Sequence, residues 1–158
     1  MLKFRRYSTF FLCMTVIGGV TFQAVAQSHP VEPEEGLAYK TGNPADWPKE
    51  LDAVIAAPDN HKILMENDRV RVLEVTMAPA TVEPLHSHQW PSILYIQSAG
   101  DFIDRDADGK TIIDTRTLPE PLTFPMTIWK DPEAPHSAEN LSDTQTIRLI
   151  RVEIKPQK

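Results

Sequence analysis

The stretch VEPLHSHQWPSILYIQSAG, residues 82–100, places His86 and His88 one residue apart in a chain that contains five histidines. In a β-strand, side chains at positions i and i+2 point to the same face, about 7 Å apart at their origins. An H-x-H pair on a strand therefore aims both imidazoles at one point, as a shared metal ion requires. Two ligands alone bind a metal weakly, and His136 in the segment APHSAEN is the natural third if the fold brings its strand beside the first.

The segments on either side of this stretch have the pattern of short antiparallel strands. KILMENDRVRVLEVTM contains two β-rich runs around Asn67-Asp68, and DFIDRDADGKTIID contains two more around Asp108-Gly109. Both dipeptides are typical of tight hairpin turns. Two further β-rich runs, PLTFPMTIWK and TQTIRLIRVEIK, follow later in the chain. Many short strands at close spacing predict an all-β fold, either an antiparallel sandwich or a barrel.

The part of the chain before the strands has a different composition. Residues 28–44 are rich in proline, glutamate and glycine and lack periodicity, which predicts an extended arm. A short helix of about three turns is expected next, with Asp46 as its cap, Pro48 in its first turn and its end before Pro58. Its apolar face would consist of Leu51, Val54 and Ile55. We therefore expect an arm and short helix over residues 27–60 and one barrel domain over residues 61–158.

The first 26 residues have the order of a secretory signal peptide. Basic residues come first, an apolar run follows, and the small-x-small pattern ends at Ala26. The apolar run is too short and wrongly flanked for a stable membrane span. Cleavage after Ala26 and a periplasmic or secreted location are therefore expected.

Removal of this segment changes the charge and cysteine content of the chain. It carries three basic and no acidic residues, so 13 positive and 22 negative side chains remain, a net charge of −9. Such an acidic protein repels nucleic acid and anionic lipid. The single cysteine, Cys13, also lies in this segment, so the mature chain would contain no disulfide.

Two segments together resemble the signature motifs of the cupins. EPLHSHQWPSILYIQSAG resembles the first motif, in which H-x-H is followed by a glutamate and a glycine, and PHSAEN resembles the second, which carries H-x-x-x-N. The resemblance covers roughly His61 to Ile154. It implies a double-stranded β-helix, a jelly-roll barrel, with a divalent metal inside held by His86, His88 and His136.

The chain departs from the cupin pattern at several positions. The glutamate of the first motif is expected where this chain has Ser92 and Ile93, neither of which can replace a carboxylate. Ala80 stands at the position of the early glycine, and Asn140 is interpreted as a turn or supporting residue rather than a ligand. The remaining three imidazoles suit iron, zinc, manganese, nickel or copper without selecting one, and a metal-free site is an open alternative.

A small, partly apolar pocket is expected beside the histidines. If Ile93 occupies the glutamate position of the motif, Tyr95 and Gln97 share its inward parity. Together with Trp90 and Trp129 they are the predicted ligand-binding residues, although core packing is the competing interpretation for both tryptophans.

Three further residues receive assignments outside this pocket. Glu83 has the opposite strand parity to His86 and is predicted to be a rim or supporting group. His29 lies in the proline-rich arm and His61 precedes the first strand, so both are expected to be solvated.

The segment DRDADG matches the start of a calcium-binding loop through Asp104, Asp106, Asp108 and Gly109. The twelfth position of such a loop needs a glutamate, but Thr115 stands there. The flanking segments have strand patterns rather than helical ones. A hairpin turn is therefore the preferred interpretation.

These patterns support two classes of function. The first is an exported protein that uses the metal and pocket to bind a small-molecule ligand, with homodimerisation through strands at the barrel edge as a further option. The second is a metal-dependent dioxygenase or isomerase, against which no carboxylate can be placed near the metal from sequence. A degenerate, metal-free binding or structural domain is the third alternative.

Overall fold

The computed structural model describes residues 42–157. The predicted signal peptide, Cys13, His29 and most of the predicted arm lie outside these residues. Nine strands and four short helical segments follow one another along the chain: η1 (Pro44–Asp46), η2 (Lys49–Leu51), α1 (Ala53–Ala56), β1 (His61–Glu66), β2 (Val70–Met77), β3 (His86–His88), β4 (Ser92–Ser98), β5 (Phe102–Asp106), β6 (Thr111–Asp114), η3 (Thr115–Thr117), β7 (Met126–Lys130), β8 (Glu133–Asn140) and β9 (Ile147–Ile154). No helix within this range is long and apolar enough to cross a membrane.

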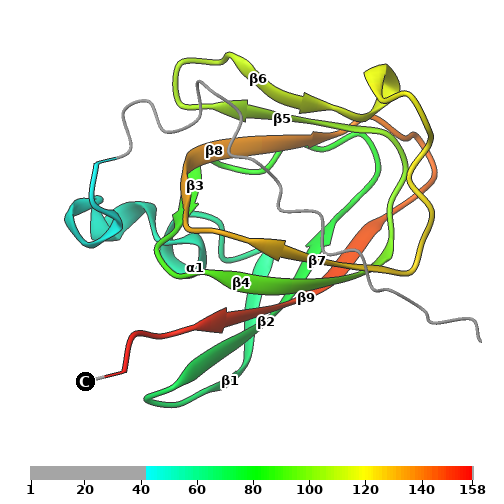
Figure 1. The fold of residues 1–158 in the computed structure, drawn as a ribbon. Helices are drawn as coiled ribbons and strands as arrows, with labels where there is room; N and C mark the ends of the chain where they lie inside the picture. The colour runs from blue at the N-terminus through cyan, green and yellow to red at the C-terminus, as the bar shows by residue number, and fades with distance from the viewer. Residues whose placement is uncertain (1–41, 158) are drawn as a thin grey trace, which may run out of the picture. The chain divides into compact units, whose positions relative to one another are not determined.

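The strands form two antiparallel sheets that face each other (Figure 1). One sheet has five strands in the order β1-β2-β9-β4-β7, and the other has four in the order β3-β8-β5-β6. Strands far apart in sequence therefore lie side by side, such as β2 and β9, which pair over their full lengths. This confirms the predicted all-β fold, an antiparallel double-stranded β-helix.

The core lies between the two sheets because each strand alternates its side chains. In β2, every second residue is buried, and in β4 the buried positions alternate with exposed ones in the same way. Most of the buried apolar side chains of the core come from the five-stranded sheet, namely Leu73, Val75, Met77, Leu94, Ile96 and Ile147. The four-stranded sheet adds Ile103. The histidines lie in the same interior, together with inward-facing residues of both sheets.

Both predicted hairpins are confirmed. The Asn67 side chain accepts hydrogen bonds from the backbone N–H groups of Arg69 and Val70, which closes the turn between β1 and β2. Gly109 adopts a φ of 80°, a conformation that glycine tolerates, in the turn between β5 and β6. The DRDADG segment is therefore a strand and its hairpin turn.

The single three-turn helix predicted from Asp46 to Ala57 is wrong. Three short pieces occupy this region, and only the four-residue α1 is an α-helix. Asp52 interrupts the helix because its backbone is extended and its side chain accepts a hydrogen bond from the Val54 N–H, starting α1 afresh. It also forms a bridge with Ser87 of β3, so a tertiary contact overrides the local helical pattern.

Candidate metal centre and cavity

Three elements bring four histidines to one point inside the barrel. Strand β3 carries His86 and His88 and pairs with β8, where His136 lies directly opposite His86. The fourth, His61, is the first residue of β1 and follows α1 closely. All four side chains are buried, with exposures of 6% or less.

The four imidazole rings form one compact cluster. The ring centroid of His86 lies 4.6 Å from that of His61, 5.0 Å from that of His88 and 4.5 Å from that of His136. The widest of the measured separations, between His88 and His136, is 5.8 Å.

Each imidazole has its Nδ1 atom beside a hydrogen-bond acceptor. A backbone carbonyl or a carboxylate can only accept, so each neutral ring must carry its proton on Nδ1, and its Nε2 lone pair is left free. This arrangement orients imidazoles as metal ligands in proteins. The four pairs are His61 with the Ala57 carbonyl (3.3 Å), His86 with the Pro84 carbonyl (2.9 Å), His88 with Glu153 (2.8 Å) and His136 with the Ala134 carbonyl (2.8 Å).

Burial keeps His61, His86 and His88 neutral. Desolvation, helped by the positive charge of Arg151, lowers the pKa of His61 to about 3. Desolvation and the neighbouring His136 lower the pKa of His86 to about 2. Burial likewise lowers the pKa of His88 well below its usual value. Neutral imidazole is the form that binds metal ions.

The donor atoms fall into two overlapping sets that suit a metal ion. The ligand atoms of His61, His86 and His88 all lie within 4.8 Å of one another, and those of His88, Glu133 and His136 do so as well. The buried three-histidine set contains a residue that the sequence assigned to solvent, because His61 is only 4% exposed. That assignment is wrong.

A carboxylate lies close to the histidines although this chain has Ser92 and Ile93 where the cupin motif has its glutamate. Glu133 of β8 lies directly opposite His88 and forms ion pairs with Lys130 (2.7 Å) and Arg151 (2.6 Å). Burial alone raises the pKa of Glu133, but these two cations outweigh it and hold the pKa well below its usual value. The sequence alone could place no carboxylate near the site, and the structure places Glu133 there from the opposite strand.

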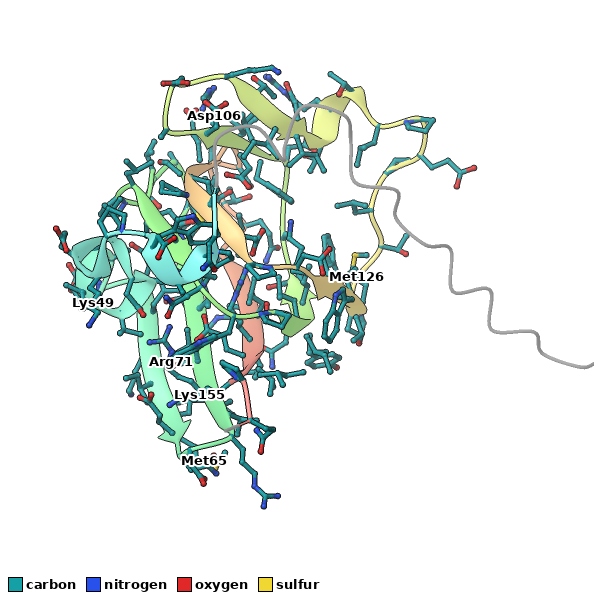
Figure 2. All side chains as sticks on the ribbon, turned by 60° about the vertical axis from the view of Figure 1, so that its left-hand side comes forward. Lys49, Met65, Arg71, Asp106, Met126 and Lys155 are labelled. Carbon is teal, nitrogen blue, oxygen red and sulfur yellow. The ribbon has the colours of Figure 1, made fainter. Side chains whose placement is uncertain are left out.

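A buried chain of charged groups supports His88 from outside the cluster. Glu153 accepts from His88 through one oxygen and from Arg71 through the other. Arg71 also donates to Asp52 at 3.1 Å. Its guanidinium lies 4.9 Å from the ring centre of Trp90, which Lys155 approaches as well, at 5.0 Å. Figure 2 shows Arg71 and Lys155 next to each other. Because both cations lie over its ring, Trp90 packs against them and does not form a wall of the pocket.

A cavity of about 240 Å³ adjoins the histidine cluster. All four histidines line it, and its remaining wall is mostly apolar and comes from both sheets. Charged side chains enter this wall at Glu83, Asp104, Glu133, Lys130 and Arg151. The cavity therefore combines nitrogen ligands, an apolar interior and a few polar groups, as small-molecule sites do.

The four predicted pocket residues do not line this cavity. Tyr95 and Trp129 are 45% and 54% exposed, and Gln97 is also on the outer face of β4. The predicted inward orientation of Tyr95 and Gln97 is wrong because Ser92, not Ile93, faces inward, so the even-numbered residues of the strand point to the core. Trp129 donates to Asp131 at the surface (3.0 Å).

Glu83 is not a rim residue. It is 6% exposed, lines the cavity, and has one carboxyl oxygen 3.8 Å from Nε2 of His86. Burial raises the pKa of Glu83 to about 7. Strand parity could not be carried across Pro84, which separates Glu83 from β3, so its orientation was not accessible from the H-x-H pattern.

Three positions of the cupin-like motifs, Ala80, Gly100 and Asn140, have a clear structural basis. Ala80 adopts a φ of 53°, the left-handed conformation that favours the glycine of the motif. A Cβ atom on Gly100, the final glycine, would lie 2.6 Å from Cβ of Ser142. Asn140 is structural, as predicted: its side-chain amide donates to three backbone carbonyls in the loops beside β8.

Comparisons with known proteins show the fold alone. No family model matches the chain, and no curated protein matches it. Among solved structures, the chain is similar to a cupin domain from Bordetella pertussis, with 21% identity and a TM-score of 0.50 over 61% of this chain and 92% of that one. It is also similar to an RmlC-like cupin family protein with a double-stranded β-helix fold from Methanocaldococcus jannaschii, with 12% identity and a TM-score of 0.44 over 60% and 78% of the two chains. The likeness to the cupin domain from Bordetella pertussis shows a shared fold, the double-stranded β-helix described above.

Proposed function

We propose that this protein binds a divalent transition metal through its buried histidines and holds a small organic ligand in the adjoining cavity. The compact set of His61, His86 and His88 would provide three ligands, and His136, which the cupin resemblance implies as a ligand, would provide a fourth. The supporting observation is the common arrangement of the Nδ1 atoms, which leaves each Nε2 free.

The residues present fit such a metal. Imidazole nitrogens suit zinc, iron, copper and nickel, and outer hydrogen bonds of this kind raise ligand basicity. Glu153 adds a negative charge behind His88, and Glu133 adds one beside the cluster. When bound, the metal would supply a Lewis acid at one end of the cavity.

Metal content tests this proposal with a matched control. His86→Ala is the informative variant because it leaves only a backbone carbonyl without its partner, whereas loss of His88 would strand a buried Glu153. The control is His29→Ala, which removes a histidine that belongs to neither cupin-like motif of the sequence. We expect near-stoichiometric metal by elemental analysis in the untagged wild type and in His29→Ala, and a loss in His86→Ala. Equal, negligible metal in all three, prepared without chelator, would overturn the proposal.

We also propose that the protein is exported from the cytoplasm. The first 26 residues have the composition of a signal peptide, and an exported location would allow the protein to meet ligands outside the cytoplasm. N-terminal sequencing of the protein from the extracytoplasmic fraction should begin at Gln27. A mature N-terminus at Met1 would refute this part without affecting the metal site.

One observation favours the alternative of a metal-dependent dioxygenase or isomerase. Glu83 and Asp104 place two carboxyl groups in the cavity beside the histidines, where acid or base groups would be needed. Turnover of a ligand once one is identified, with loss of turnover but not of binding in the His86→Ala variant, would support the enzyme.

A further inference from the structure

Two acidic side chains in the cavity have no use in the metal site. Glu83 and Asp104 both line the cavity and are 6% and 8% exposed. Each has a buried carboxyl oxygen without a hydrogen-bond partner among residues 42–157, Oε2 of Glu83 and Oδ1 of Asp104. Burying such atoms unpaired costs free energy, and groups of this kind persist where a ligand uses them.

The four-stranded sheet holds these two residues in fixed positions on either side of Ala138. The Glu83 backbone N–H donates to the Ala138 carbonyl at 3.0 Å, and its own carbonyl accepts from the Ser137 hydroxyl at 2.7 Å. Asp104 of β5 is the register partner of Ala138 from the other side. The two residues therefore flank Ala138 on opposite sides of β8, and both side chains line the cavity.

The two cationic side chains that line the cavity form ion pairs with Glu133, not with Glu83 or Asp104. Lys130 and Arg151 both pair with Glu133, at 2.7 and 2.6 Å. Nε2 of His86, which lies 3.8 Å from Glu83, carries no proton when that ring is neutral, because Nδ1 faces the Pro84 carbonyl and must donate to it. Among the described cavity residues, Glu83 and Asp104 are therefore the acids that have no ion pair with a lysine or arginine.

The rest of the wall is suited to a hydrocarbon. Apolar side chains from both sheets surround the acidic corner, including Leu94, Ile96, Phe102, Ile113, Met126 and Ile128. The volume of about 240 Å³ equals roughly eight water molecules at their share of liquid volume. A ligand of about eight to ten non-hydrogen atoms fits this space.

We propose that Glu83 and Asp104 bind the ammonium group of a small organic amine whose hydrocarbon body occupies the apolar part of the cavity. An ammonium has three donors and a positive charge, so it satisfies both unpartnered oxygens and offsets their charge. A hydroxyl group has one donor and can satisfy only one of them. A carboxylate would meet like charges at this corner. This inference rests on the proposed function for the use of the cavity, but it does not require a bound metal.

Matched six-carbon probes test the proposal by isothermal titration calorimetry at pH 8. Hexylamine, 1-hexanol and hexanoate have similar size and differ in the head group, and the amine is protonated because alkylammonium groups titrate near the lysine value of about 10.4. The full chain is measured both metal-loaded and after chelator treatment, so that coordination of the amine to a metal is separated from binding at the acids. We expect hexylamine to bind at least tenfold more tightly than either other probe in both forms.

Three variants place the binding on the named residues. Glu83→Gln and Asp104→Asn preserve shape and should each weaken hexylamine binding by tenfold or more. Glu139→Gln is the control, because Glu139 pairs with Arg105 at 2.8 Å and does not line the cavity. This variant should bind hexylamine as tightly as the wild type does. Circular dichroism melts verify that all three fold.

Several outcomes would overturn the proposal. They are equal binding of 1-hexanol, preferred binding of hexanoate, and unchanged hexylamine affinity in both cavity variants. Loss of a second equivalent of bound metal in Asp104→Asn would assign the corner to a metal ion instead. Failure of the metal site appears separately, as the absence of metal from the untreated protein, and leaves the chelator-treated titrations readable.

Discussion

Acid should destabilise the metal-free protein steeply, because the folded chain must keep His61, His86 and His88 neutral. The pKa of His61 is lowered to about 3 and that of His86 to about 2, and that of His88 also falls well below its usual value. In the unfolded chain the same groups titrate near 6.5. Between about pH 5 and 6 the unfolded state therefore binds three protons at these positions that the folded state does not, so the free energy of unfolding decreases as the pH falls.

Glu83 acts in the opposite direction. Its pKa is raised by burial to about 7, so in the same pH range the folded state holds one proton that the unfolded state has released. The net difference is about two protons, which corresponds to a slope of about 2.7 kcal/mol per pH unit. Asp104 and Glu153, whose pKa values burial also raises, reduce this slope only where those values exceed the pH of the measurement.

Urea unfolding of chelator-treated protein at pH 5.0, 5.5 and 6.0, followed by tryptophan fluorescence, measures this slope. His61→Gln removes one histidine and should lower the slope to about 1.4 kcal/mol per pH unit, whereas Glu83→Gln removes the opposing group and should raise it to about 4 kcal/mol per pH unit. A slope near zero in the wild type, or equal slopes in the two variants, would refute the assignment of neutral, buried histidines.

Three other changes test the fold and the corrected pocket. Gly100→Ala should lower the free energy of unfolding by about 1–3 kcal/mol through overpacking against Ser142, and Ser142→Gly in the same chain should restore most of it, as measured by urea melts. Ala80→Gly should raise the melting temperature, because relief of the left-handed backbone outweighs the added flexibility of the unfolded chain by about 1 kcal/mol; an unchanged or lower temperature would contradict this. Trp129→Ser should leave metal content and hexylamine affinity unchanged, since the side chain lies outside the cavity; a fivefold weaker affinity would return it to the site.

The sequence predicts the strands and three of the four histidines because these depend on local patterns. The H-x-H spacing fixes the common face of His86 and His88, and the turn dipeptides fix both hairpins. His61 could not be identified in this way, since its burial depends on the way α1 leads into β1. One available signal was the apolar AVIAA run just before it, which indicates that the chain there packs against a core.

The pocket was mispredicted for a related reason. Burial of β4 alternates, but SILYIQ contains apolar residues on both parities, so the sequence alone does not select a face. The parity of His86 and His88 cannot be extended to β4, because Pro91 separates the two strands and they belong to different sheets. Glu133 and Glu83 reach the site through pairing between β8 and distant segments, which no local pattern contains.

The short segment before β1 contributes residues that the metal site needs. The Ala57 carbonyl that orients His61 belongs to the end of α1, and Asp52 at its start anchors the Arg71 and Glu153 pair behind His88. A chain trimmed to its nine strands would keep both sheets but lose the supports of two imidazoles. The smallest fragment that keeps the complete metal site is therefore larger than the barrel. A protein that contains only the nine strands should keep the fold but bind the metal more weakly.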